Sequence, residues 1–277
     1  MGLTIIQVDA FTSELFSGNP AAICVTPEPL EDSLMQKIAA EMNLSETAFL
    51  SPIDGGFSLR WFTPAVEVDL CGHATLASAH VLWQEGHLPA GEPAKFLTNS
   101  GWLGAAQKGR WIELDFPARP TQPAHVMPQL IKSLCCGGNV RSVSKNNENY
   151  LVEVQSEAVL KKLHPDFAEM KKLPVQGVIA TAAAQSDEYD FVSRYFAPNV
   201  GIDEDPVTGS AHGSLAPYWQ AKLGKSEMLA KQISARGGVV RVKCQRANSN
   251  DSVEAADNRI LISGEAVTVL KGELLMA

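Results

Sequence analysis

The sequence lacks any long apolar run and any block of basic residues, and each absence excludes a class of protein. A membrane-spanning helix requires about 20 consecutive apolar residues, and no segment of this chain approaches that length. Lysine and arginine number 23 against 31 aspartate and glutamate residues, which gives a formal net charge of −8. Because nucleic-acid binding depends on clustered positive charge, we expect neither a nucleic-acid partner nor a membrane-embedded protein.

Cysteine is sparse and has no pairing pattern. The chain has five cysteines, an odd number, and none is spaced C-x-x-C. Cys135 and Cys136 are adjacent, but their neighbours do not supply the further ligands that a metal would need. The first residues have no basic region before their brief apolar stretch, so they predict an opening strand and not an export signal. We therefore expect reduced thiols in a cytoplasmic protein without a metal site.

Common nucleotide and nucleophile motifs are also missing. No G-x-G-x-x-G follows an expected strand, and no G-x-S-x-G is present. Residues 223–226 (LGKS) imitate the end of a phosphate-binding loop, but Trp219 stands where its first glycine would be. These absences argue against nucleotide use and against a serine hydrolase.

The chain of 277 residues is longer than a usual single core, so two domains are expected. Most of it consists of short stretches rich in Val, Ile, Phe and Trp between Gly, Pro and Asn, a pattern that indicates strands. The expected strands are residues 3–11, 20–26, 46–51, 57–63, 95–99, 110–116, 139–144, 149–155, 175–182, 189–196, 238–244 and 259–271.

Three helices are expected among these strands. Residues 31–42 place apolar side chains on one face and predict an amphipathic helix. Residues 73–85 and 210–222 have small and apolar side chains on every side. A helix that is apolar all round is buried, so we expect each of these two to lie inside a domain.

The two buried helices belong to segments that resemble each other. Residues 68–83 and 203–219 both run from an acidic turn through glycine and small residues to an Ala-His pair and a final Trp. This similarity suggests an internal duplication. The proline-rich run at 117–123 is the natural boundary, so we predict an N-terminal lobe of residues 1–117 and a C-terminal lobe of 118–277. The boundary leaves one alternative open, in which the last strands, 259–271, cross back to the first lobe.

Both buried helices begin at a turn with glycine, Gly72 in the first and Gly209 in the second. A helix N-terminus exposes unpaired N–H groups and carries partial positive charge, so it can hold a carboxylate. The alternative is that the glycines merely permit tight turns and that Thr208 or Ser210 caps the second helix. The sequence alone leaves both interpretations open.

Three ionisable residues are candidates for chemistry, each with a structural alternative. Glu46 is the odd residue in an apolar, strand-forming stretch; it is either solvent-exposed or buried in a cleft and able to move protons. Asp205 lies in Asp-Glu-Asp-Pro, which is also typical of an ordinary turn. His73 can equally be a core histidine with its hydrogen bonds satisfied.

Several motifs together resemble one family. They are residues 8–12 (VDAFT), 18–21 (GNPA), 43–49 (NLSETAF), 62–64 (FTP), 72–75 (GHAT) and 204–211 (EDPVTGSA). In this order they are similar to the PhzF-like (phenazine biosynthesis-like) isomerases of the diaminopimelate-epimerase-like fold superfamily. The resemblance covers residues 8 to 219. It implies an α+β fold of two pseudo-symmetric lobes, each a curved, mostly antiparallel sheet wrapped round a central helix, and a homodimer.

The resemblance also implies a chemistry and a site. PhzF moves a proton within a dihydro-hydroxyanthranilate without cofactor or metal, so we expect a small carboxylate-bearing substrate and no cofactor. The implied catalytic residues are Glu46, His73, Asp205 and Ser210. The implied substrate-binding residues are Gly18, Asn19, Gly72, Ala74, Thr208 and Gly209. In this hypothesis Glu46 takes a proton from an acidic carbon and returns it elsewhere on the molecule, while the other side chains orient the substrate and the helix ends hold its carboxylate.

Departures from related families leave alternatives open. Epimerases and racemases of similar architecture use two opposed cysteines, whereas here only the first helix start has one, Cys71. Cys71 either contributes as a lone thiol or is buried and inert. Ala74 stands where PhzF itself is expected to have proline, which weakens a role in phenazine synthesis. The competing hypotheses are an amino-acid epimerase of related fold that uses Glu46 with Cys71 or another residue, and a catalytically idle protein that binds a small metabolite or another protein.

Overall fold

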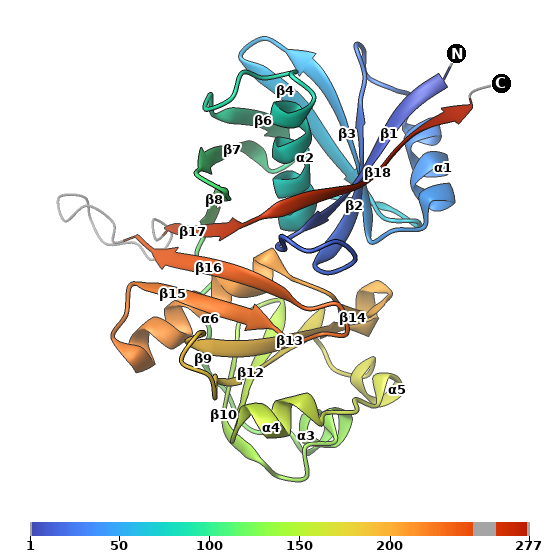
Figure 1. The fold of residues 1–277 in the computed structure, drawn as a ribbon. Coiled ribbons are helices and arrows are strands. Elements are labelled where there is room, and N and C mark those ends of the chain that lie inside the picture. Colours follow the sequence, from blue (N-terminus) through green and yellow to red (C-terminus); the bar gives the residue numbers. More distant parts are fainter. Residues whose placement is uncertain (1, 246–258, 276–277) are drawn as a thin grey trace. The chain divides into compact units, whose positions relative to one another are not determined.

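The computed structural model describes residues 2–245 and 259–275, drawn in colour in Figure 1. The chain forms two compact units, one of Met1–Phe116 with Leu261–Ala277 and one of Pro117–Ile260. The sequence-based division placed the last strands in the second lobe and allowed that they cross back to the first. The structure assigns them to the first unit from Leu261 on. Within the described residues, no helix is long and apolar enough to cross a membrane.

The first unit is a mixed sheet with two helices. Its strands are β1 (Gly2–Ala10), β2 (Asn19–Val25), β3 (Glu46–Ile53), β4 (Gly56–Phe62), β5 (Glu67–Val68), β6 (Ala94–Thr98), β7 (Gly101–Lys108), β8 (Trp111–Pro117) and β18 (Ala266–Leu275). They pair in the order β18-β1-β2-β3-β4-β6-β7-β8, with β5 beside β4. β2–β3 and β4–β6 are parallel, and the other pairs in this unit are antiparallel.

The two helices of this unit have the character that their sequences predict. α1 (Asp32–Met42) is amphipathic and buries Met35, Ile38 and Ala39 against an apolar cluster of the sheet. α2 (Gly72–Gln84) has a small hydrophobic asymmetry because it is apolar on every side, and most of its residues are buried. Figure 1 shows α2 inside the curve of the sheet, where it contacts β1, β2 and β3.

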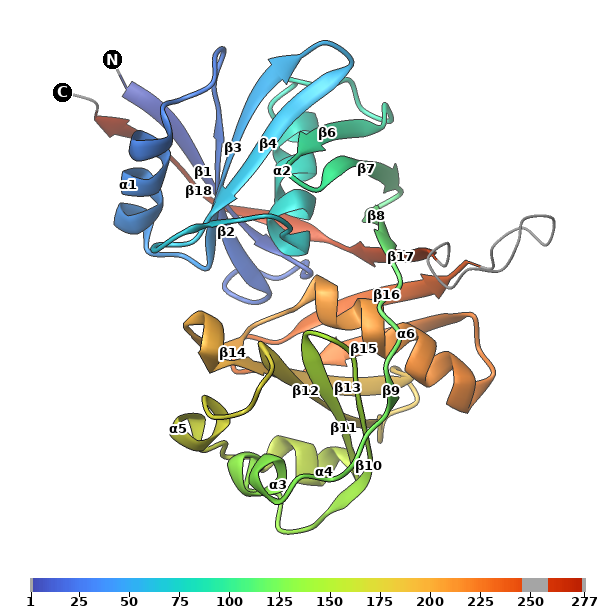
Figure 2. The ribbon, with the colours of Figure 1, turned by 180° about the vertical axis from the view of Figure 1, so that it is seen from behind.

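The second unit contains the remaining elements. They are β9 (Gln122–Pro123), α3 (Pro128–Leu134), β10 (Val140–Lys145), β11 (Asn149–Val154), α4 (Glu157–Lys161), α5 (Phe167–Met170), β12 (Gly177–Ala183), β13 (Phe191–Ala197), a 3₁₀ turn (Pro198–Val200), β14 (Ile202–Asp205), α6 (Gly209–Leu223), β15 (Glu227–Gln232), β16 (Gly238–Cys244) and the start of β17 (Arg259–Gly264). α6 is buried like α2 and contacts β16. Figure 2 shows α3, α4 and α5 gathered at one end of this unit, where they enclose a second apolar cluster.

The same succession of strand pairings occurs in both units. β1–β2, β3–β4 and β6–β7 are antiparallel, and β2–β3 and β4–β6 between them are parallel. In the second unit β10–β11, β12–β13 and β15–β16 are antiparallel, and β11–β12 and β13–β15 are parallel. In both units the second parallel crossover contains a short strand and then the buried helix: β5 and α2 in one, β14 and α6 in the other.

Some sequence-based expectations need correction. Residues 202–205 form strand β14 and not an ordinary turn, because they pair antiparallel with β13. The expected strand 259–271 is interrupted at Glu265, where β17 ends and β18 begins. The short helices α3, α4 and α5 have seven or fewer residues each, too few for a 3.6-residue period to be recognised.

Gly18 precedes β2 and has a backbone that only glycine adopts freely. Its φ is +65°, and a Cβ there would lie 2.2 Å from the carbonyl oxygen of Ala10. Gly109 has a similar φ of +64°, with open space around it. We therefore expect Gly18→Ala to lower the free energy of unfolding by about 2 kcal/mol or more, and Gly109→Ala to show only the backbone cost of about 1 kcal/mol. Urea titration of both variants measures the difference, and equal losses would contradict the predicted clash.

Candidate functional site

In the first unit, three separate segments converge because of the sheet order. Asn43 ends α1 in a left-handed conformation, and the chain enters β3 at Glu46. β3 runs parallel to β2, with Glu46 opposite Ala21, so Asn19 at the start of β2 lies nearby. α2 packs on both strands and begins at Gly72, which brings His73 in its first turn to the same end. The fold thus gathers Glu46, His73 and Asn19, three residues predicted from the sequence.

Glu46 and His73 form a buried pair. Their residues are 8% and 5% exposed, so Glu46 is not the solvent-facing side chain that one interpretation expected. Nε2 of His73 lies 3.1 Å from Oε2 of Glu46. These two atoms are not aligned as a full hydrogen bond, and among the described residues neither has another hydrogen-bond partner. Buried polar atoms are almost always satisfied in folded proteins, so this exception singles out the pair as a candidate site.

The other ring nitrogen of His73 has two neighbours. Nδ2 of Asn19 lies 3.2 Å from Nδ1, and Sγ of Cys71 lies 3.5 Å from it. Ser45, next to Glu46 in sequence, donates a hydrogen bond of 3.3 Å to Oδ1 of Asn19. Gly72 and Ala74 belong to the same first turn of α2 and are buried, and Gly18 immediately precedes Asn19.

The charges of this cluster influence one another. Burial and the Glu46 carboxylate raise the pKa of the Cys71 thiol to about 11, so Cys71 keeps its proton at neutral pH. For His73, burial lowers the pKa, whereas the charges of Cys71 and Glu46 raise it, and the net direction is above the ordinary value. Because Cys71 keeps its proton at neutral pH, the Glu46 carboxylate is the neighbour whose charge favours a protonated imidazole there. Cys71 is therefore a protonated thiol and not an activated nucleophile.

Among the described residues, Glu46, Cys71 and His73 form a group whose potential metal-ligand atoms lie within 4.8 Å of one another. The imidazole, however, stands between the other two, with Nδ1 toward the thiol and Nε2 toward the carboxylate. A carboxylate in contact with an imidazole is also an arrangement suited to proton transfer.

The second unit carries the other predicted residues at the start of α6. Asp205 ends β14 and is 7% exposed. Thr208 is the N-cap residue of α6, but its side chain does not cap the helix, contrary to one of the expected alternatives. Its hydroxyl instead donates a hydrogen bond of 2.5 Å to Oδ2 of Asp205. Gly209 and Ser210 form the first turn of α6, where Gly209 is buried and Ser210 is partly exposed.

Gln232, which sequence reasoning missed, fixes this turn. It is fully buried at the end of β15. Its amide nitrogen donates to the carbonyl of Asp205 (2.8 Å) and to the hydroxyl of Thr208 (3.2 Å), and its amide oxygen accepts from the Thr208 N–H (3.0 Å). Buried residues alternate with more exposed ones along β15. Had this strand been predicted from the sequence, Gln232 would have stood out as a polar residue on the buried face. Ser45 was also missed, because a serine before a strand carries no sequence signal.

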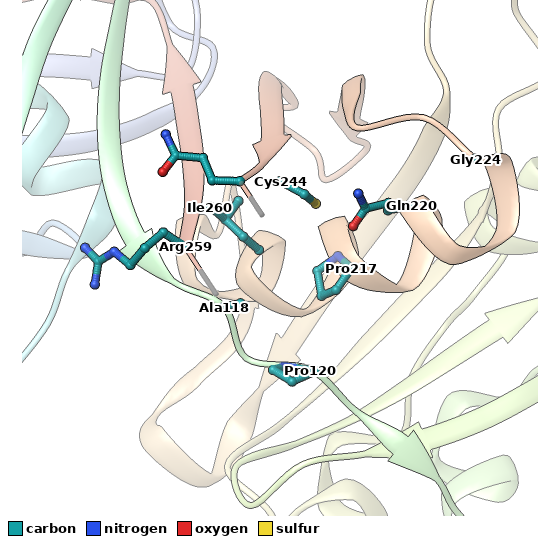
Figure 3. Close-up of a pocket in the computed structure, with 9 residues that line it drawn as sticks. Ala118, Pro120, Pro217, Gln220, Gly224, Cys244, Arg259 and Ile260 are labelled. Atoms are coloured by element: carbon teal, nitrogen blue, oxygen red, sulfur yellow. The ribbon is translucent and has the colours of Figure 1, made fainter. Parts of the chain in front are cut away.

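One pocket of the second unit lies apart from these residues. It has a volume of about 400 Å³ and is shown in Figure 3, lined by residues that include Pro120, Pro217, Gln220 and Arg259. None of the residues predicted for the site lines it. The pocket therefore does not contribute to the candidate site.

The fold is sheet-rich with few helices, and solved structures of a phenazine biosynthesis protein and of a predicted epimerase share it. The family model of phenazine biosynthesis-like proteins (PhzC-PhzF) matches residues 8–272. The chain belongs to this PhzF-like family.

Individual relatives extend this result. A protein of Halalkalibacterium halodurans named an uncharacterized isomerase is 51% identical over 277 residues and 100% of both chains. A crystal structure of a PhzF-family phenazine biosynthesis protein from Enterococcus faecalis matches 100% of both chains with a TM-score of 0.90 and 38% identity. A predicted epimerase from Pseudomonas aeruginosa covers 99% of this chain and 100% of its own, with a TM-score of 0.72 and 20% identity, and it shares the fold.

Proposed function

We propose that this protein is an isomerase that moves a proton within a small carboxylate-bearing molecule, with Glu46 as both base and acid and without a cofactor. The observation that supports this most is the buried Glu46–His73 pair, whose facing oxygen and nitrogen lack aligned partners among the described residues. A buried carboxylate beside an imidazole is suited to proton transfer at carbon. Relatives named isomerases agree with the proposal.

The remaining site residues have supporting roles in this proposal. His73, Asp205 and Ser210 orient polar groups of the substrate. The N–H groups at the starts of α2 and α6, around Gly72 and Gly209, bind its carboxylate through the partial positive charge of a helix N-terminus. Thr208 donates to the Asp205 carboxylate, and Gln232 holds the Asp205 backbone and the Thr208 hydroxyl in place. We also propose a homodimer, as the family resemblance implies, which light scattering tests.

The proposal includes an internal duplication in which the proton-transfer carboxylate belongs to one repeat. The shared order of strand pairings supports two pseudo-symmetric lobes. In that correspondence β3, which opens with Glu46, matches β12, which opens with Gly177. The second repeat therefore contributes binding groups in place of a second base.

Cys71 favours one competing function, an epimerase that uses Glu46 together with Cys71. The thiol is 3.5 Å from the imidazole that contacts Glu46, but its raised pKa leaves little thiolate to act as a base at neutral pH. Chiral chromatography of free amino acids after incubation tests this alternative. Product analysis of dihydro-hydroxyanthranilate and other cyclic carboxylates tests the isomerase, and stereoinversion without isomerisation would replace the proposal with the epimerase.

A further inference from the structure

The two nitrogens of the His73 ring face chemically different neighbours. Nδ1 lies 3.2 Å from the amide nitrogen of Asn19 and 3.5 Å from the sulfur of Cys71. Nε2 lies 3.1 Å from the carboxylate of Glu46. All of these side chains are buried, with Asn19 fully so. The ring is therefore bounded by potential donors on one side and by an acceptor on the other.

The hydrogen-bonding capacity of each neighbour decides which nitrogen keeps a proton. An amide nitrogen and a protonated thiol donate, whereas a carboxylate accepts. The Ser45 hydroxyl donates to Oδ1 of Asn19, which turns the NH₂ end of that amide toward the imidazole. The Cys71 thiol can donate or accept, but the Asn19 amide nitrogen can only donate, so Nδ1 is the acceptor of the neutral ring.

We infer that Ser45 and Asn19 are positioning residues that keep the proton of the neutral His73 imidazole on Nε2, facing Glu46. If His73 gains a second proton, Nε2 is protonated in that state as well. In both states Nε2 has no free lone pair. Glu46 therefore cannot pass to His73 a proton that it has gained.

The consequence for catalysis rests on the proposed function. When Glu46 removes a proton, the C–H electron pair enters the unsaturated system of the substrate and an O–H bond forms on Glu46. That O–H bond then breaks as a new C–H bond forms at another carbon of the same molecule, so no co-reactant is required. Because His73 cannot accept the proton from Glu46, a deuterium placed on the substrate carbon that loses its proton is expected to be found in part on the product.

Nitrogen NMR of the full-length protein tests the inference without a substrate. Histidine is labelled with ¹⁵N and spectra are recorded across a pH titration, with His73→Gln identifying the resonances. We expect the Nδ1 resonance to move as the ring loses its second proton while Nε2 keeps the shift of a protonated nitrogen. His80, further along α2 and 3.1 Å from the Thr268 hydroxyl, serves as the internal reference. A titration in which Nε2 loses its proton would overturn the inference.

Two variants test the positioning residues themselves. In Asn19→Asp the new carboxylate accepts from Nδ1–H, so we expect the neutral ring to lose its Nε2–H signal. Because Asn19 is fully buried, Ser45→Ala serves as a second variant that leaves the amide in place and is expected to give a mixture of both neutral forms. Wild-type spectra from both variants would remove Asn19 and Ser45 from this role. These results do not depend on turnover, so they are distinguishable from a failure of the proposed function.

Discussion

Replacing Glu46 by glutamine is expected to lower turnover by about 10²–10⁴-fold, the contribution of a positioned general acid–base group. Glutamine has nearly the same shape but can neither take a proton from carbon nor return one. The side chain is buried 3.1 Å from His73, and the neutral amide can still contact the imidazole. We therefore expect the fold to be retained, as measured by circular dichroism and thermal unfolding alongside the kinetic assay.

A matched control separates this effect from a general change in charge. Glu41 lies on α1 of the same unit and is exposed. Glu41→Gln removes the same charge without touching the site, so its turnover is expected to equal that of the wild type. A Glu46→Gln protein that folds and keeps wild-type turnover would remove Glu46 from the mechanism.

Acidification is expected to destabilise the second unit through His212. This residue is fully buried in α6, where Nδ1 donates a hydrogen bond of 2.8 Å to the carbonyl of Thr208. Burial lowers its pKa from 6.5 to about 4. A histidine with a depressed pKa stabilises the fold fully above pH 6.5, and this stability is lost as the pH falls toward 4. The interval corresponds to about 3 kcal/mol of unfolding free energy.

Urea titrations between pH 7 and pH 4 measure this loss. In His212→Asn the amide can replace the Nδ1 donor, but it is smaller than the buried imidazole, so we expect the variant to be less stable at pH 7. The amide gains no proton on acidification, so the variant is expected to lose about 3 kcal/mol less unfolding free energy than the wild type as the pH falls. The exposed His164 provides the control, since His164→Asn is expected to follow the wild-type pH profile. Parallel profiles for the wild type and His212→Asn would show that His212 does not carry this loss.

The parts of the fold that the sequence predicts are those with strong periodicity. α1, α2 and α6 were expected within one residue at each end, because an amphipathic or uniformly apolar run of eleven residues or more is unambiguous. β14 and β15 were missed because their charged residues resemble a turn and a solvated segment. Their pairings show that both belong to the sheet: β14 and β15 each pair with β13, and β15 also pairs with β16.

The candidate site was predicted from motifs, but the hydrogen bonds between its residues could be found only in the structure. Glu46 and His73 were chosen from short segments that resemble a family, and the packing of α2 on β2 and β3 explains why they meet. Hydrogen bonds between residues 26 and 24 positions apart, Ser45 with Asn19 and Gln232 with Thr208, follow from strand register. Sequence alone contains no signal for such contacts, so Ser45 and Gln232 could not be found beforehand.

Deuterium uptake in heavy water tests the central claim most directly. Wild type and Glu46→Gln are incubated with a panel of small cyclic and amino carboxylates that includes dihydro-hydroxyanthranilate. Mass spectrometry measures the deuterium content of the products. We expect incorporation or isomerisation in at least one compound with the wild type and its loss with Glu46→Gln. Incorporation at the same rate in both proteins would contradict it, because the proton would then move without Glu46.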